Sequence, residues 1–260
     1  MSVSFNRDGP VARVCIDRPA SLNAIDRATL NDLLVIWDAI ERDGTLRAVV
    51  LTGAGDRAFC VGADMKSDQE EDADGLAYWA SMPESGFGGI SLRTTLDIPV
   101  LARVNGHALG GGLEMMLGCD LVIASSKATF GLPEPRVGRL PLDGGVGLIV
   151  RRLPHAQAMA LLLTGKRIGA DEAFRIGLVN EVVEPDKLDE AVDRWLADIL
   201  ACAPLPLKAI KQMARAAATR TPREVQMLRL PALVAMLQST DQVEGVQAFR
   251  EKRPPRWQGR

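Results

Sequence analysis

The chain is poor in the residue types on which several large classes of protein depend. Among 260 residues there are two histidines and four cysteines, and aromatic residues make up only 4%. The cysteines, Cys15, Cys60, Cys119 and Cys202, are far apart in the sequence and form no CxxC pair. This spacing argues against a disulfide framework and against a zinc site. We therefore expect no metal site.

An excess of positive charge and a long hydrophobic run are also missing. Thirty-one basic residues balance thirty-three acidic ones, for a net charge of −2. Non-specific nucleic-acid binding needs a basic face, and base stacking needs aromatic side chains, so we do not expect a nucleic-acid partner. No apolar stretch reaches the roughly 18 residues that a membrane span requires. The first residues do not resemble a signal peptide, and we expect a cytoplasmic protein.

The composition that remains, 47% hydrophobic and 25% charged, is typical of a soluble globular protein. Short apolar runs predict strands at 11–16, 48–52, 100–104, 121–124 and 178–183, and residues 53–64 read as a loop. Helical spacing follows Asp26, a predicted N-cap, as far as Gly44, and a helix is expected after the glycines at 110–112. Further helices are expected at 145–153, 156–163, 171–176, 186–201, 205–218, 223–238 and 240–250. No linker divides the chain, which favours one α/β core with a helical C-terminal portion.

A possible nucleotide motif follows the second predicted strand. Residues 53–58 match GxGxxA, the dinucleotide-binding pattern. That pattern requires an amphipathic helix directly afterwards and an acidic residue about 20 positions on. Phe59 to Gly62 does not have the pattern of such a helix. The position at which the acidic residue is expected falls near Tyr78. The sequence therefore gives no support to a nicotinamide cofactor.

An acidic segment lies at residues 67–75 and holds five acidic side chains with almost nothing apolar. Two interpretations remain open, an exposed helix start and a mobile lid. The glycines at 86, 88 and 89 indicate flexibility on its far side.

Two glycine-containing loops are the first features that suggest chemistry. Cys60–Asp64 and Asn105–Glu114 each place small residues after a predicted strand. The glycine run at 110–112 precedes a helix, whose first N–H groups lack partners within the helix. Small residues let such groups approach a ligand oxygen closely, and one donor from each loop would form an oxyanion hole. Tight packing of helix on strand explains the same residues equally well from spacing alone.

Glu114 and Glu134 form a candidate acid–base pair. Glu114 lies two residues beyond the glycine run, and Glu134 stands between two prolines. Two carboxyl groups beside an oxyanion hole can hold one water between acid and base roles. Taken alone, each glutamate is more often a cap or a surface charge than a catalytic group.

Together these segments resemble the enoyl-CoA hydratase/isomerase (crotonase) superfamily. The resemblance is carried, in the expected order over nearly the whole chain, by residues 18–24, 59–66, 105–114, 119–120, 130–134, 144–145, 163–165, 173–183 and 249–253. It implies a crotonase-like spiral of ββα units over 1–200. It also implies a helical trimerisation region over 201–260, with trimers that pair into hexamers.

The resemblance also implies the functional residues. The N–H groups of Ala63 and Gly111 would form the oxyanion hole for an acyl-CoA thioester. CoA itself would lie along Ala24, Ala63, Asp64, Met65 and Lys66. Because CoA is part of the substrate, no further cofactor is expected.

In hydratases of this family, the residues matching Glu114 and Glu134 add water to a 2-enoyl-CoA. Glu114 would activate the water, and Glu134 would hold it and protonate the α-carbon. Alternatives are an enoyl-CoA isomerase that uses Glu134 alone, and a CoA- or RNA-binding protein without activity.

One stretch departs from the hydratase pattern, which has a small residue where Leu142 stands. Asp143 is one position later than the aspartate of dienoyl isomerases. Because Leu142 and Asp143 match neither pattern, the sequence does not identify the acyl group of the substrate. Residues 67–95, with Trp79 and Phe87, are expected to shape the acyl pocket.

Overall fold

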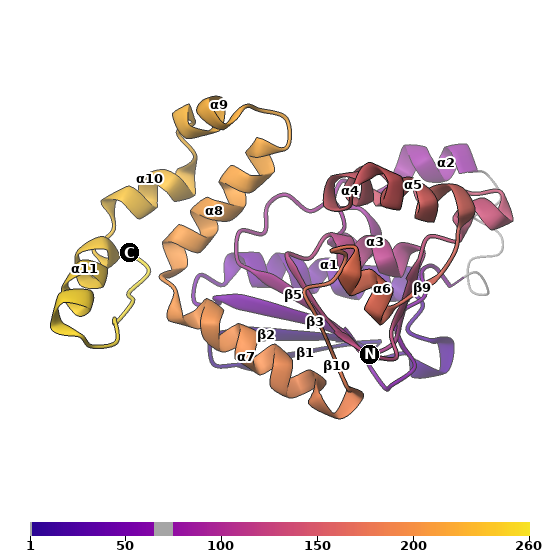
Figure 1. Ribbon diagram of the computed structural model, residues 1–260, viewed down its shortest axis with the longest axis horizontal. Helices are drawn as coiled ribbons and strands as arrows, with labels where there is room; N and C mark the ends of the chain where they lie inside the picture. Colours follow the sequence, from indigo (N-terminus) through magenta and orange to yellow (C-terminus); the bar gives the residue numbers. More distant parts are fainter. Residues whose placement is uncertain (1, 65–74) are drawn as a thin grey trace. The chain divides into compact units, whose positions relative to one another are not determined.

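The computed structural model describes residues 2–64 and 75–260. These residues form two compact units (Figure 1). The larger comprises the described residues of 1–93 together with 100–193, and the smaller comprises 94–99 together with 194–260. Both sheets belong to the larger unit, and the smaller one is built from helices.

The first sheet of the larger unit has six strands in the order β1-β2-β3-β5-β7-β10. They are β1 (Val3–Asp8), β2 (Val11–Ile16), β3 (Ala48–Gly53), β5 (Val100–Val104), β7 (Leu121–Ser125) and β10 (Glu181–Val183). β1 pairs antiparallel with β2, and every other pair is parallel. The central strands are almost entirely buried, as their unbroken apolar runs require in a parallel sheet covered on both faces.

The second sheet has four short strands in the order β4-β6-β8-β9. They are β4 (Ala58–Cys60), β6 (His107–Leu109), β8 (Thr129–Gly131) and β9 (Ile168–Gly169). The prediction that residues 53–64 form only a loop is wrong for β4. Three residues are too few to show a periodic pattern, and β4 is a strand because it pairs with β6.

Pairs of strands followed by a helix repeat along the larger unit. β5 and β6 precede α3 (Gly111–Leu117), and β7 and β8 precede α4 (Gly145–Arg152). In each repeat, the first strand joins the six-stranded sheet and the second joins the four-stranded sheet. The predicted spiral of ββα units is therefore confirmed. The turns after β6 and β8 carry the predicted glycine run and Glu134.

The remaining helices of the larger unit connect and cover these strands. They are η1 (Pro19–Ser21), α1 (Arg27–Arg42), α2 (Gly75–Ser81), η2 (Phe87–Gly89), η3 (Glu134–Val137), α5 (His155–Thr164), α6 (Ala170–Arg175) and η4 (Pro185–Lys187). The predicted N-cap is confirmed, since the Asp26 side chain accepts a hydrogen bond from the Thr29 N–H at 2.8 Å. α1 buries Trp37, whose indole N–H donates to the carbonyl of Gly88 at 2.8 Å and ties α1 to η2.

The smaller unit contains the end of α7 (Leu188–Ala201), then α8 (Pro204–Ala217), α9 (Pro222–Met227), α10 (Pro231–Gln238) and α11 (Asp241–Glu251). The single helix predicted over 223–238 is wrong, because the chain leaves helical geometry between α9 and α10. Leu228 and Leu230 are extended there, and Leu230 precedes a proline that disfavours helical geometry in it. No helix within 2–64 and 75–260 is both long and apolar enough to cross a bilayer.

Candidate active site

The two predicted glycine loops lie directly against each other. Gly62 has a φ of +99°, and a Cβ atom on it would lie 3.2 Å from the backbone nitrogen of Gly111. A Cβ atom on Gly112 would collide with the carbonyl of Cys60. Glycine is therefore needed at both positions for the loop after β4 to approach the start of α3 so closely. The close packing expected from spacing is confirmed.

The loop around Ala63 is also bonded to the segment before α1, through a backbone bridge to Ile25. Ile25 donates its N–H to the carbonyl of Gly62 at 2.9 Å, and Asp64 donates its N–H to the carbonyl of Ile25 at 2.9 Å. These bonds use the carbonyl of Gly62 and the N–H of Asp64, and they do not involve the N–H of Ala63. No hydrogen bond between two described residues uses the N–H of Ala63 or of Gly111. Neither amide N–H therefore has a hydrogen-bond partner among the described residues.

Glu114 lies on α3 and is only 2% exposed. Its Oε1 accepts the N–H of Gly145 at 2.8 Å. Because Gly145 is the first residue of α4, this N–H has no partner within its own helix. Burial, together with the negative charge of Asp143, raises the pKa of Glu114 to about 8 against the opposing effect of the Gly145 hydrogen bond.

Glu134 is the first residue of η3 and approaches the glycine run from β8. Its Oε1 lies 3.0 Å from the position a Cβ atom on Gly110 would take. Its Oε2 is buried and has no hydrogen-bond partner in the described part of the chain. Burial raises the pKa of this carboxyl above its usual value. The predicted pair is therefore brought together at Gly110, whose carbonyl also accepts the backbone N–H of Glu114 at 3.1 Å.

A third carboxyl group, Asp143, adjoins this pair. It is 4% exposed, and its Oδ2 accepts the hydroxyl of Tyr78 at 2.5 Å. Its backbone carbonyl accepts the hydroxyl of Ser91 at 2.7 Å. Burial raises the pKa of Asp143, against the lowering effect of the Tyr78 hydrogen bond. The sequence marked Asp143 as a departure from the family pattern, but nothing local pointed to Tyr78 or Ser91 as its partners.

The residues predicted to bind CoA are only partly described. Met65 and Lys66 lie outside the described residues, as does the acidic segment 67–74. Asp64 forms an ion pair with Arg18 at 2.9 Å, and Ala24 offers its backbone carbonyl to the same guanidinium group. In the sequence, Arg18 is only the first residue of a family motif, and its several contacts arise in the folded chain.

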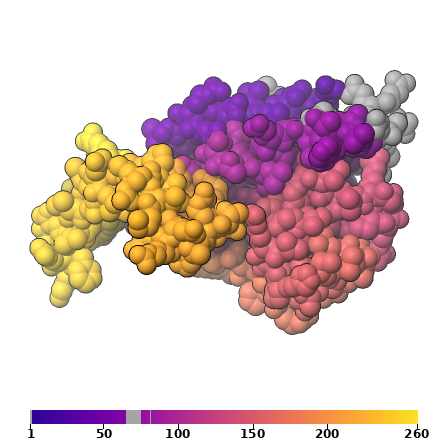
Figure 2. All heavy atoms as spheres, turned by 90° about the horizontal axis from the view of Figure 1, so that it is seen from above, coloured from indigo at the N-terminus to yellow at the C-terminus, as the bar shows by residue number. Residues whose placement is uncertain are grey.

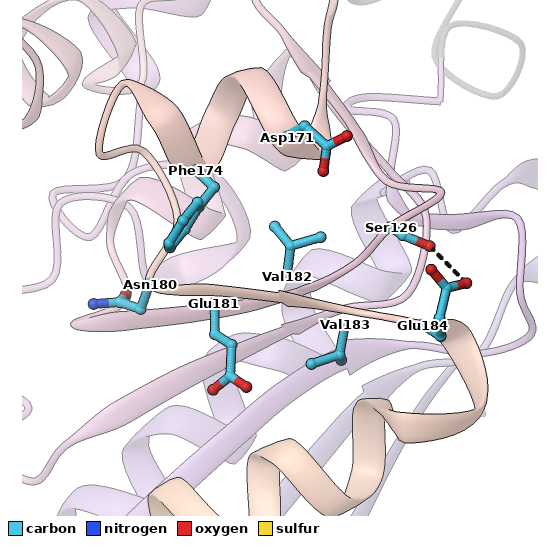
Figure 3. Close-up of a pocket in the computed structure, with 8 residues that line it drawn as sticks. All are labelled: Ser126, Asp171, Phe174, Asn180, Glu181, Val182, Val183 and Glu184. Carbon is cyan, nitrogen blue, oxygen red and sulfur yellow. Dashed lines mark hydrogen bonds between the residues drawn. The ribbon is translucent and has the colours of Figure 1, made fainter.

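A separate surface hollow lies between β10 and α6, and Figure 3 shows its lining. The side chains there are Ser126, Asp171, Phe174, Asn180, Glu181, Val182, Val183 and Glu184. Ser126 donates its hydroxyl to Glu184 at 3.1 Å, as the dashed line marks. The hollow contains none of the residues predicted to be functional. Within 2–64 and 75–260, no three His, Cys, Asp or Glu side chains gather as metal ligands.

Fold and site together define a member of one family: the profile described as enoyl-CoA hydratase/isomerase matches residues 6–260, and the chain belongs to that family. The chain is 37% identical to a carnitinyl-CoA dehydratase of Citrobacter koseri, over 100% of its own length and 99% of that protein. It is 38% identical to an (E)-benzylidenesuccinyl-CoA hydratase of Thauera aromatica, over 100% of both. A crystal structure of an enoyl-CoA hydratase from Bacillus anthracis matches with a TM-score of 0.92 and 30% identity over 100% of both chains.

The match over the whole chain makes this protein an enzyme of CoA thioesters of the hydratase or dehydratase type. The names of these relatives specify different acyl groups, so the comparison does not identify one substrate.

Proposed function

We propose that the chain adds water syn across the double bond of a 2-enoyl-CoA, or removes it in reverse. The carrying observation is the buried Glu114 and the half-buried Glu134, whose Oε2 is itself buried, next to two backbone N–H groups that no described residue uses. Hydration of an enoyl thioester needs both features, since it moves a proton and builds negative charge on the thioester oxygen.

The N–H groups of Ala63 and Gly111 are proposed to bind that oxygen. Fixed donors stabilise the enolate without reorganising, and one such donor contributes about 3–4 kcal/mol in comparable sites. The contact of Gly62 with the Gly111 nitrogen supports this role, because it brings the two loops within one ligand's reach.

Glu114 is proposed to activate the water for attack at the β-carbon. Glu134 holds the same water and delivers a proton to the α-carbon. The Gly145 N–H fixes Oε1 of Glu114, which supports an oriented carboxyl for this role. The unpartnered Oε2 of Glu134 supports a role in proton transfer, because a buried carboxyl oxygen is normally hydrogen-bonded.

CoA is proposed to lie along Ala24, Ala63, Asp64, Met65 and Lys66, with Lys66 near its nucleotide. The chemistry proposed here draws on amides and carboxyls and needs no metal or redox cofactor. We propose self-association through the helices of 201–260, as a trimer or a pair of trimers. The four free cysteines suit the reducing cytoplasm, the compartment we propose.

The acyl group is proposed to carry a substituent beyond the β-carbon. Both relatives named above act, by name, on such acyl groups rather than on a plain alkyl chain. A carnitinyl group carries a quaternary ammonium, whereas a benzylidenesuccinyl group carries a carboxylate. The two therefore differ in the sign of their charge, which a site rich in carboxyl groups would distinguish.

The test follows the loss of enoyl-thioester absorbance with crotonyl-CoA. We expect turnover by the wild type and a loss of about 10²–10⁴-fold in kcat for Glu114→Gln and for Glu134→Gln, since each removes one acid–base group. Glu190→Gln, which changes an exposed carboxyl on α7, is the matched control and should keep full activity. Full turnover by Glu134→Gln would overturn its role. Conversion of a 3-enoyl-CoA that needs Glu134 but not Glu114 would instead identify an isomerase.

A further inference from the structure

Asp143 has a feature that the proposed hydration does not use. One carboxylate oxygen, Oδ2, is held by Tyr78, but Oδ1 is buried and has no partner within 2–64 and 75–260. The side chain is 4% exposed, so bulk water does not replace the missing partner. Leaving a buried carboxylate oxygen unpaired is costly, which points to a group that arrives with the ligand.

The charge balance at this site is one-sided. Glu114, Glu134 and Asp143 are close enough for the latter two charges to raise the pKa of Glu114. No lysine, arginine or histidine is among the groups of the described chain that shift the pKa of any of the three. A buried carboxylate is stabilised by a cation or takes up a proton, and here the described residues provide no cation beside Asp143.

Tyr78 gives the site a second means of binding a cation. It is the only tyrosine of the chain, and it reaches Asp143 from α2, 65 residues away in sequence. In Figures 1 and 2, α2 lies beside α4 and α5, which follow Asp143. A carboxylate and an aromatic ring are the two groups that bind alkylammonium ions most readily, by charge and by cation–π attraction.

The position of Asp143 indicates which part of the substrate it meets. Gly145, two residues further on, donates to Glu114, whose proposed role is at the β-carbon. A substrate group near Asp143 therefore lies close to the β-carbon, and the γ-carbon is the acyl position that adjoins it.

We propose that Asp143, held by Tyr78, recognises a positively charged nitrogen attached to the γ-carbon of the acyl group. This rests on the proposed hydratase function and narrows its substrate class. The same carboxylate disfavours an acyl group that carries a second carboxylate, because like charges repel in a buried site.

Two thioesters of equal shape test the proposal: 4-(trimethylammonio)-2-butenoyl-CoA and its uncharged carbon isostere, 5,5-dimethyl-2-hexenoyl-CoA. We expect the wild type to show a kcat/KM at least about 10-fold higher for the cationic one, a difference of about 1.4 kcal/mol. With each enzyme measured at its own pH optimum, Asp143→Asn should abolish this preference and change kcat/KM for the isostere less than about threefold. Tyr78→Phe should weaken the preference in part, because the ring remains. Asp186→Asn, an exposed change in η4, should have no effect.

Binding of the corresponding saturated thioesters separates this proposal from the hydratase function. 4-(Trimethylammonio)butanoyl-CoA and 5,5-dimethylhexanoyl-CoA cannot react, so calorimetry measures recognition alone. Tighter binding of the cation by wild type but not by Asp143→Asn supports the proposal even if no thioester is hydrated. Equal binding of both by the wild type, or an equal loss of both in folded Asp143→Asn, would overturn it.

Discussion

In the proposed mechanism, Glu114 and Glu134 share a single proton. In the proposed hydration, Glu114 accepts a proton from water while Glu134 gives one to carbon, and dehydration reverses both transfers. The pair therefore works only when one of the two carboxyls is protonated. Its two apparent pKa values belong to the pair as a whole, because the two charges interact.

The pH dependence of kcat/KM should follow from this shared proton. Since the pKa of Glu114 is raised to about 8, the pair loses its last proton near that pH, and activity should fall above it. The pKa of Glu134 is also raised, so the acid limb should lie above pH 4.5. Because the reaction releases no net proton, hydration and dehydration should show the same acid and alkaline limbs in kcat/KM. Rates in both directions, measured from pH 4 to pH 10, would check this.

Asp143→Asn is the internal check of this profile. The carboxylates of Asp143 and Glu134 raise the pKa of Glu114, and the N–H of Gly145 lowers it. Removing the first charge should move the alkaline limb to lower pH. A limb that stays in place in this variant would show that Glu114 does not govern it.

At the scale of elements, the loop after β4 depends on a contact with the segment before α1. The guanidinium group of Arg18 reaches Asp26 at 2.8 Å, Asp64 at 2.9 Å and the carbonyl of Ala24. It thus joins the N-cap of α1 to the residue that follows Ala63. Arg18 is a positioning residue in this view, acting on the Ala63 N–H through the loop.

We expect Arg18→Lys to lower kcat by about 10–100-fold. An ammonium group cannot make the forked contacts of a guanidinium, and small displacements at a site of this kind have effects of that size. Arg42→Lys on α1, at an exposed arginine, is the matched control. The alkaline pKa of the profile should stay unchanged in Arg18→Lys, because the carboxyl pair is intact. A change in that pKa, or full activity, would contradict a role in positioning.

At the scale of the whole molecule, the smaller unit presents apolar side chains that nothing in the chain's described part covers. Val243, Val246 and Phe249 follow one another at helical spacing on α11 and are 69%, 53% and 85% exposed. The C-terminal tail is secured within this unit, since Arg253 pairs with Glu244 and the carboxylate of Asp241 accepts two backbone N–H groups. An uncovered apolar row on a well-secured helix supports the self-association that we propose.

We expect light scattering to give three or six times the chain mass of 28.0 kDa. Phe249→Ser should shift this distribution toward smaller species, because it removes the most exposed apolar side chain of the row. Leu163→Ser, which changes a similarly exposed residue on α5, is the comparison for a general effect of polarity. A monomer at all concentrations in the wild type would refute the proposed assembly.

The sequence by itself determined the family, through motifs in a fixed order, and the spiral of ββα units followed from that resemblance. Local signals predicted β2, β3, β5, β7 and β10 as apolar runs and the N-cap of α1 as an aspartate. They did not predict β1 or the short strands β4, β6, β8 and β9 of the second sheet, which are strands because they pair with one another. Nor did they show the break between α9 and α10.

Only the tertiary structure decided how the carboxyl groups are partnered. The contact of Tyr78 with Asp143 joins residues 65 positions apart, and that of Gly145 with Glu114 joins residues 31 positions apart. No local pattern encodes such pairs, because they depend on where the ββα repeats place their helix ends in space. The same placement removes water from the three carboxyls, and it is this loss of hydration that raises their pKa values.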